Sequence, residues 1–293
     1  MNILALGGTR YFGKHMVQNL LKNGHNITIA TRGKAKDDFG NHVNRLIVER
    51  TDPDSLKKAV HYSHYDVIYD NLAYCSNDVK HILDFADCGR YVMTSSTAVY
   101  NKHIDTSENE FNPETKKLIW CDRTDLPYDE AKRQAEYALW QKYQHVKAIA
   151  VRFPFVIGKD DYTNRLYFYV KHVIKDIPMF IDNINYQMSF VRSDEAGAFL
   201  AFFAENNYFG AINGSSEGTV SISEIIEYVI SKTGKTPIIL SDGEKAPYNG
   251  ENEYSINVEL AKKLGFTFTP LKSWLYDLLD FYIDKASCQY REA

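Results

Sequence analysis

Short apolar runs of strand length recur along the first half of the chain, and most are separated by stretches in which apolar residues return at helical spacing. The runs are Ile3–Leu6, Ile27–Ala30, Leu46–Val48, Val67–Tyr69, Tyr91–Thr94 and Ala148–Val151. This alternation predicts successive βαβ units, whose right-handed crossovers place helices on both faces of one parallel sheet. We therefore predict an α/β fold with a doubly wound parallel sheet and a ligand crevice at the carboxyl ends of its strands.

The pattern changes after about residue 155, where the strict alternation gives way to aromatic-rich helices, short strands and glycine turns. We predict a first domain over residues 1–155, to which later segments return, and a smaller, mainly substrate-binding lobe over residues 156–293. Within the lobe, Val258–Asp284 has the pattern of two amphipathic helices separated by a break at Gly265–Pro270.

A glycine-rich turn, MNILALGGTRYFG, follows the first apolar run and comes directly before a helical pattern. In such a strand-turn-helix, Gly7 permits a tight turn, Gly8 lets the backbone approach a pyrophosphate, and Gly13 lets the helix pack closely on the sheet. The free N–H groups and positive dipole end of the helix then face the phosphates. Glycines this dense also occur in ordinary loops. The strand before and the helix after them favour a dinucleotide-binding Rossmann fold for residues 1–155.

The residues after the second strand bear on the choice of coenzyme. NAD sites usually place an acidic residue there to bind the ribose hydroxyls, but this chain has Thr31, then Arg32 and Lys34. These two cations, together with Arg10 in the glycine turn, suit a 2′-phosphate. The alternative is that all three are solvated loop charges. Because a missing acid and added cations point the same way, we predict NADP in preference to NAD.

An acidic stretch follows the third strand. The segment Glu49-Arg50-Thr51-Asp52 has the position of an acidic side chain that contacts the adenine amino group. Asp52 is equally suited to cap a helix that begins at Pro53.

Candidate catalytic residues lie further along the chain. Tyr128 and Lys132 are four apart and share one face of a predicted helix. A lysine ammonium beside a phenol lowers the phenol pKa and makes the tyrosine a usable acid or base. A serine hydroxyl at the end of the fifth apolar run is placed to polarise the same substrate oxygen. A lone Tyr-x-x-x-Lys pair is common, but its order after the glycine turn and the serine-rich strand end favours a catalytic role.

Composition and charge narrow the class of protein. The 293 residues are 44% hydrophobic and 25% charged, as in ordinary globular proteins. A net charge of -4 argues against nucleic acid as the main partner. No apolar run approaches the ~18 residues that span a bilayer, so we expect no membrane association and a cytoplasmic location. The four cysteines and nine histidines lack metal-ligand spacing, and we predict reduced thiols and no metal site.

In combination, these motifs resemble those of an extended short-chain dehydrogenase/reductase of the NAD-dependent epimerase/dehydratase family. The resemblance extends over nearly the whole chain. The matching segments are Gly7–Gly13, Asp70–Ala73, Ser95–Tyr100, Tyr128 with Lys132, Arg152–Gly158 and Ser193–Ala196.

The resemblance implies an NAD(P)-dependent oxidoreductase that transfers a hydride at a hydroxyl or carbonyl carbon of a sugar-like or nucleotide-sugar substrate, with a tyrosine as acid and base. It assigns catalysis to Ser96, Tyr128 and Lys132. Together with the positions after the second and third strands, it predicts that the coenzyme is bound by Gly7, Gly8, Thr9, Arg10, Tyr11, Phe12, Gly13, Thr31, Arg32, Glu49, Asn71, Leu72, Ala73, Ser95, Tyr128, Lys132, Phe153 and Phe155. Family members often form homodimers through two helices of each subunit, and the sequence leaves both the oligomeric state and the net reaction open.

Two departures from the family pattern affect these expectations. Arg10 replaces the middle glycine of the coenzyme turn, as in an atypical branch that includes chloroplast stem-loop RNA-binding proteins and uncharacterised reductases. Where nucleotide-sugar enzymes often carry an arginine for the diphosphate, this chain has Gln187-Met188-Ser189. The second departure puts the nucleotide-sugar substrate in doubt but not the redox chemistry.

Two alternatives stay open at this point. One is a reductase of a non-nucleotide carbonyl compound, and the other is a non-catalytic coenzyme-binding or RNA-binding protein on the same fold. The second has no need for Ser96, Tyr128 and Lys132 together. In the later lobe, Arg165 and Arg192 are either ligands for a phosphate or carboxylate or ordinary surface charges.

Overall fold

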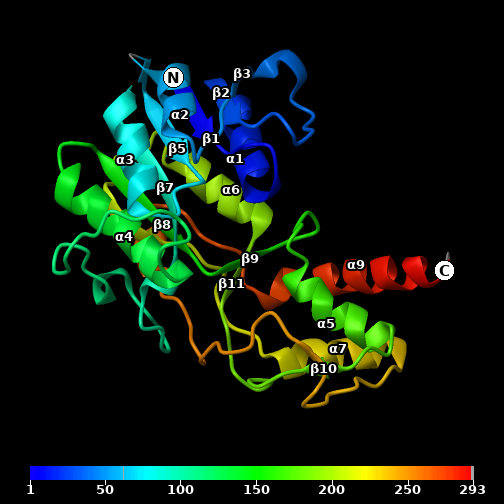
Figure 1. Ribbon diagram of the computed structural model, residues 1–293. Helices are drawn as coiled ribbons and strands as arrows, with labels where there is room; N and C mark the ends of the chain where they lie inside the picture. The colour runs from blue at the N-terminus through cyan, green and yellow to red at the C-terminus, as the bar shows by residue number, and fades with distance from the viewer. Residues whose placement is uncertain (62, 292–293) are drawn as a thin grey trace.

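A computed structural model of the chain describes residues 1–61 and 63–291. Its central element is a seven-stranded sheet in the order β12-β8-β7-β5-β1-β2-β3, in which every neighbouring pair is parallel (Figure 1). These strands are β1 (Asn2–Leu6), β2 (Asn26–Thr31), β3 (Asn44–Ile47), β5 (Val67–Asp70), β7 (Tyr91–Ser96), β8 (Ala148–Phe153) and β12 (Gly210–Asn213). The chain runs outward from β1 to β3 and then outward again on the other side, so the order reverses beside β1, as in doubly wound sheets.

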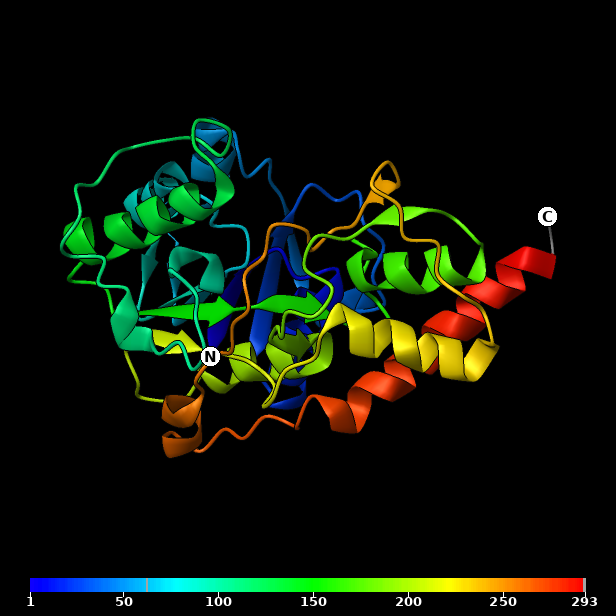
Figure 2. The same cartoon turned by 90° about the horizontal axis from the view of Figure 1, so that it is seen from below.

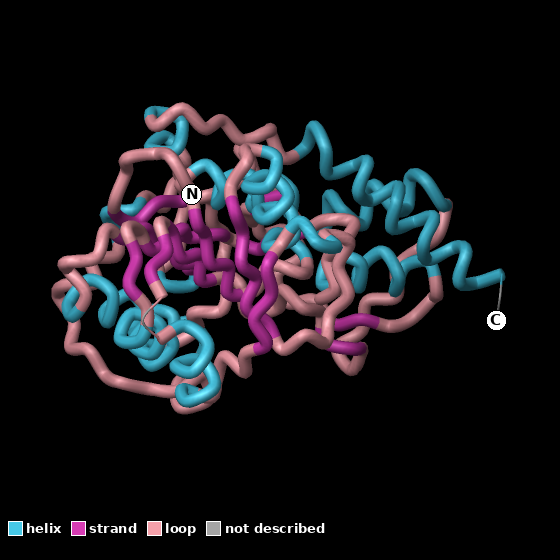
Figure 3. Tube along the Cα trace, turned by 90° about the horizontal axis from the view of Figure 1, so that it is seen from above, coloured by secondary structure: helices cyan, strands magenta, loops and turns pink. Residues whose placement is uncertain are grey.

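Helices cover both faces of this sheet (Figure 3). The helices of the chain are α1 (Tyr11–Lys22), α2 (Pro53–Val60), α3 (Ser76–Phe85), α4 (Tyr128–Lys142), α5 (Arg165–Ile174), α6 (Ser193–Phe202), α7 (Ile222–Thr233), α8 (Glu259–Lys263) and α9 (Lys272–Arg291). Helices α1 and α6 pack against each other on one face, and α2, α3 and α4 form the layer on the other.

The two faces hold separate cores because side chains alternate along each strand. In β1, Ile3 and Ala5 belong to the core under α1 and α6, whereas Leu4 and Leu6 belong to the core under α2, α3 and α4. All four are 0–1% exposed. The strands of a parallel sheet covered on both sides thus read as continuous apolar runs, which is the pattern seen in the sequence.

A smaller lobe lies beside the sheet and contains α5, α7 and α9, which pack on one another (Figures 1 and 2). Its apolar interior is continuous with the core under α1 and α6. Three short strand pairs accompany these layers: β4 (His64–Tyr65) with β6 (Asp87–Cys88), β9 (Phe155–Ile157) with β11 (Phe190–Arg192), and β10 (Met179–Phe180) with β13 (Glu244–Lys245). Single 3-10 turns occur at Gly40–His42, Thr97–Val99 and Glu108–Glu110.

The doubly wound α/β fold predicted from the sequence is confirmed, and five of the six apolar runs lie wholly in a strand of the sheet; the sixth, Leu46–Val48, extends one residue beyond β3. The seventh strand, β12, was not predicted. After residue 155, α6 and β12 join the sheet layers, while α5, α7 and α9 form the lobe. The two C-terminal helices are α8 and α9, with the expected break between them. In the described part of the chain, no helix is long and apolar enough to cross a membrane.

Candidate active site

The glycine turn connects β1 to α1 and leaves its backbone bare. Gly7 has φ +78°, and a Cβ there would lie 2.9 Å from Leu72 Cγ. A Cβ on Gly13, in the first turn of α1, would lie 2.9 Å from the backbone oxygen of Gly7. Within this fully described helix, Arg10 at the N-cap makes no side-chain cap and the first turn has no acidic residue. The N–H groups and positive dipole end of α1 are therefore placed to bind an anion.

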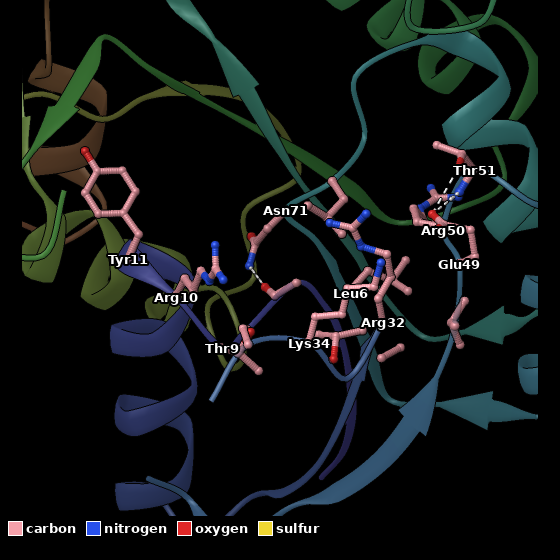
Figure 4. Close-up of a pocket in the computed structure, with 18 of the residues that line it drawn as sticks. Leu6, Thr9, Arg10, Tyr11, Arg32, Lys34, Glu49, Arg50, Thr51 and Asn71 are labelled. Carbon is pink, nitrogen blue, oxygen red and sulfur yellow. Dashed lines mark hydrogen bonds between the residues drawn. The ribbon is translucent and has the colours of Figure 1, made fainter. Parts of the chain in front are cut away.

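A first cavity of about 470 Å³ opens at the carboxyl ends of β1, β2 and β5 (Figure 4). It is lined by the glycine turn, by the residues that follow the second and third strands, and by Asn71 after β5. Asn71 fixes the turn, because its Nδ2 donates to the Gly7 oxygen at 2.6 Å and its Oδ1 accepts from Thr94 Oγ1 at 2.8 Å. One amide side chain thus joins the turn to β5 and β7.

Three cations in this cavity lack a carboxylate partner. No ion pair of Arg10, Arg32 or Lys34 occurs among residues 1–61 and 63–291, and Arg10 lies only against the ring of Tyr162, at 5.9 Å. Figure 4 shows Arg32 and Lys34 between the glycine turn and Glu49. A bare backbone turn at one end and free cations further along fit a ligand that carries a pyrophosphate and a further phosphate.

Glu49 and Asp52, the two acidic residues after β3, have different roles. Glu49 lines the cavity, and its Oε1 accepts from Thr51 Oγ1 at 3.0 Å. Asp52 caps α2, since its Oδ1 accepts from the backbone N–H of Asp54 at 3.0 Å. Of the two uses that the sequence left open for Asp52, the structure has the helix cap.

A second cavity of about 490 Å³ brings together Ser96, Tyr128 and Lys132. It adjoins the first, since five residues line both cavities: Tyr11, Phe12, Asn71, Tyr74 and Tyr162. A ligand that extends from the glycine turn past these residues therefore reaches the Ser, Tyr and Lys side chains.

Lys132 and Tyr128 differ sharply in exposure. Lys132 is 2% exposed, and its Nζ donates to the carbonyls of Ala73 at 2.7 Å and Thr94 at 2.9 Å. Tyr128, at the first residue of α4, is 53% exposed. The ammonium is thus held by the carbonyl of Ala73, in the segment after β5, and by that of Thr94, in β7. Since an ammonium has three N–H donors, one is left for a ligand.

Ser95 and Ser96 have different partners, although both border the second cavity. Ser96 Oγ accepts from the N–H of Ala98 at 3.1 Å, which leaves its own proton free for donation. Ser95 Oγ instead donates to Glu136 Oε1 at 2.6 Å in the interior. Of the two hydroxyls, only that of Ser96 is placed to polarise a substrate oxygen.

The other residues predicted from the sequence lie on one or the other cavity, with a single exception. Those on the first cavity are Gly7, Gly8, Thr9, Arg10, Tyr11, Phe12, Gly13, Thr31, Arg32, Glu49, Asn71 and Leu72. Phe153 and Phe155 line the second. Ala73 lines neither cavity and contributes only its carbonyl, which accepts from Lys132.

Sequence reasoning missed Tyr74 and Arg123. The Tyr74 ring lies between the two cavities, 4.6 Å from Lys132 Nζ and 4.8 Å from the Arg123 guanidinium carbon. Burial raises the pKa of the Tyr74 hydroxyl, which therefore stays neutral. Arg123 donates to both carboxylate oxygens of Asp78, at 3.0 and 3.2 Å, and to the Leu72 carbonyl at 2.7 Å. Only the position of Tyr74 directly after Asn71-Leu72-Ala73 was a signal in the sequence.

The chain is similar to known proteins at two levels. In sequence, the NAD dependent epimerase/dehydratase family matches residues 3–88. A curated relative, chloroplast stem-loop binding protein of 41 kDa b from Arabidopsis thaliana, is 33% identical over 114 residues, which are 34% of this chain. The matched stretch spans 30% of that relative's length.

In structure, the fold of the whole chain is shared with several solved proteins. A UDP-glucose 4-epimerase from Thermotoga maritima has a TM-score of 0.73 at 16% identity, covering 97% of this chain and 99% of its own. A UDP-glucuronic acid 4-epimerase from Bacillus cereus, in complex with NAD, has a TM-score of 0.72 at 17% identity, covering 100% and 99%. A dTDP-glucose 4,6-dehydratase from Bacillus anthracis, in complex with NAD, has a TM-score of 0.70 at 18% identity, covering 96% of each chain. Residues 3–88 thus match the NAD dependent epimerase/dehydratase family, and the chain as a whole shares its fold with these sugar-nucleotide epimerases and this dehydratase.

Proposed function

We propose that this protein is an NAD(P)-dependent oxidoreductase that transfers a hydride at a hydroxyl or carbonyl carbon of a small, sugar-like substrate. The observation that carries the proposal is the junction of the two cavities. The glycine turn and the free cations line the first cavity. The second cavity is lined by Ser96, Tyr128 and Lys132, and the two cavities share part of their lining. The solved structures of similar fold support a sugar-type substrate, since those proteins act on or bind UDP-glucose, UDP-glucuronic acid or dTDP-glucose.

Each of the three catalytic candidates has a distinct role in this proposal. Tyr128 exchanges a proton between its phenolic oxygen and the reacting oxygen of the substrate. Ser96 donates its free O–H to the same oxygen and stabilises negative charge there. Lys132, with one N–H left over, would bind the ribose of a bound nicotinamide coenzyme and keeps a positive charge near Tyr128. A nicotinamide coenzyme, when bound to the first cavity, supplies or accepts the hydride.

The proposal favours a substrate that is not a nucleotide-sugar. Gln187, which occupies the sequence position of the missing arginine, is not among the residues that line the second cavity. Its Nε2 donates to Glu224 Oε2 at 2.9 Å, and Met188 beside it is fully buried. A diphosphate therefore has no cationic partner from this segment. A reductase of a non-nucleotide carbonyl compound is thus the favoured version of the function.

NADP is the proposed coenzyme in preference to NAD, and Arg32 provides the test. Arg32→Ala should weaken NADPH binding by about 10-fold to 100-fold, because a charge-assisted contact to a phosphate contributes about 1.5–3 kcal/mol. NADH affinity should not change. Fluorescence titration of both coenzymes measures this, with Arg45→Ala as the control, since Arg45 already pairs with Asp37. Equal or tighter wild-type affinity for NADH would refute the preference.

Nucleic acid binding is the second candidate, favoured by the similarity to the chloroplast stem-loop binding protein. The net charge of -4 opposes it, since RNA affinity depends on neutralised phosphates. The two functions separate in one comparison. NADPH oxidation across a panel of carbonyl compounds supports the enzyme, whereas tight, salt-steep binding to stem-loop RNA without such oxidation supports the alternative.

A further inference from the structure

Arg165 is a charged residue of the second cavity that the proposed reaction does not use. It is the first residue of α5 and lines the same cavity as Ser96 and Tyr128. Its guanidinium carbon lies 5.0 Å from the ring centre of Phe155, and its Nε donates to Thr163 Oγ1 at 3.1 Å. The side chain is therefore oriented by two contacts, neither of which neutralises its charge.

No carboxylate forms an ion pair with Arg165 in the described part of the chain. Asp161 interacts electrostatically with Arg165, but its Oδ1 accepts from both the N–H and the hydroxyl of Thr163. Burial raises the pKa of the Asp161 carboxyl. Lys102, a second cation of the cavity, forms an ion pair with Glu251. Arg165 thus lacks the ion-pair partner that Lys102 has.

Arg192, the other cationic candidate in the lobe, differs from Arg165 in its ion pairing and in the cavity that it lines. Its Nε donates to the carboxylate of Asp194, and it lines a separate cavity with His15 and Trp274. The two arginines are therefore distinguishable. Arg165 has the position and the free charge for a ligand at the catalytic residues, and Arg192 has neither.

The backbone around Arg165 also favours binding of an anion. Helix α5 has ten residues, and its N-cap, Asn164, makes no side-chain cap and has φ 55°. Its first turn holds no acidic residue. The positive end of the helix dipole thus supports the guanidinium at the cavity wall, as at known anion sites.

We propose that Arg165 binds an anionic group of the substrate, a carboxylate or a phosphate, while the reacting carbon lies against Ser96 and Tyr128. This inference rests on the proposed function and narrows it to acidic carbonyl or hydroxyl compounds. Phe155 packs against the substrate body between the two ends of the site. A planar guanidinium suits either anion, because both offer two oxygens at the spacing of its N–H groups.

Calorimetric titration of the NADP⁺-loaded protein tests this without requiring turnover. The probes are malonate, glycerol 3-phosphate and UDP, with glycerol as the neutral match. We expect at least one anion to bind more than about 10-fold tighter than glycerol. Arg165→Gln should lower the affinity for that anion by about 10-fold to 100-fold. The tightest probe identifies the group as carboxylate, phosphate ester or diphosphate. Arg192→Gln is the matched control and should leave every affinity unchanged.

The outcomes separate the two proposals. If the protein does not bind NADP⁺ or NADPH at all, the proposed function fails. If coenzyme binds but no anion is preferred over glycerol, or the preferred anion binds Arg165→Gln as tightly as the wild type, the assignment of Arg165 is wrong and the oxidoreductase stands. Loss of NADP⁺ affinity in Arg165→Gln would also overturn the assignment, since Arg165 does not line the coenzyme cavity.

Discussion

Tyr128→Phe is expected to lower turnover by about 10²-fold to 10⁴-fold while coenzyme affinity stays at the wild-type value. The substitution removes the proton that the proposed reaction moves and leaves the ring in place. Tyr128 is 53% exposed, and within the described chain its hydroxyl makes no hydrogen bond, so the fold does not depend on that hydroxyl. The measurement is kcat for NADPH oxidation with the best compound of a carbonyl panel, beside a coenzyme titration.

Tyr186→Phe is the matched control for this loss. Tyr186 is also an exposed tyrosine, at 46%, but it lines neither cavity. Its variant should retain wild-type kcat. A Tyr128→Phe protein that turns over at the wild-type rate would remove Tyr128 from the mechanism, and one that loses coenzyme affinity as well would assign it a binding role instead.

Glu136→Ala should lower the free energy of unfolding by about 3–5 kcal/mol, the largest effect on stability that we expect from one substitution. Glu136 and Arg152 are both fully buried, and the carboxylate receives Nη2 at 2.5 Å and Nε at 2.9 Å. Removing the carboxylate leaves a guanidinium in the interior without its counter-charge. Ser95 loses its acceptor at the same time.

This buried pair also connects the elements that carry the proposed catalytic residues. Glu136 lies one turn after Lys132 on α4, Arg152 lies on β8, and Ser95 directly precedes Ser96 on β7. Urea denaturation measures the stability, with Asp38→Ala as the control because Asp38 pairs with Lys14 on the surface. A Glu136→Ala variant no less stable than that control would contradict the assigned role of the pair.

The sequence was sufficient for the fold because its signals are local. A strand covered on both faces is an apolar run, and six of the seven strands have one. Strand β12 was not predicted, because its sequence, Gly210-Ala211-Ile212-Asn213, has only two apolar side chains after a glycine. The cavity residues were likewise predictable where a motif fixes them to the end of a strand, as for Gly7, Asn71 and Ser96.

The partners of the site residues were not predictable, because they come from elements far apart in the chain. Lys132 donates to carbonyls 59 and 38 residues away, which no spacing in the sequence indicates. Arg152 follows an apolar strand pattern that gives no sign of its buried partner on α4. The difference between Arg165 and Arg192 also appears only in space, since it depends on which cavity each residue lines.

The central claim is that the glycine turn and the cations beyond it bind a nicotinamide coenzyme. Its most direct test is calorimetric titration of the purified protein with NADPH and, separately, NADH. We predict saturable binding of one coenzyme per chain, with NADPH the tighter. Failure of both coenzymes to bind the folded protein would contradict the account.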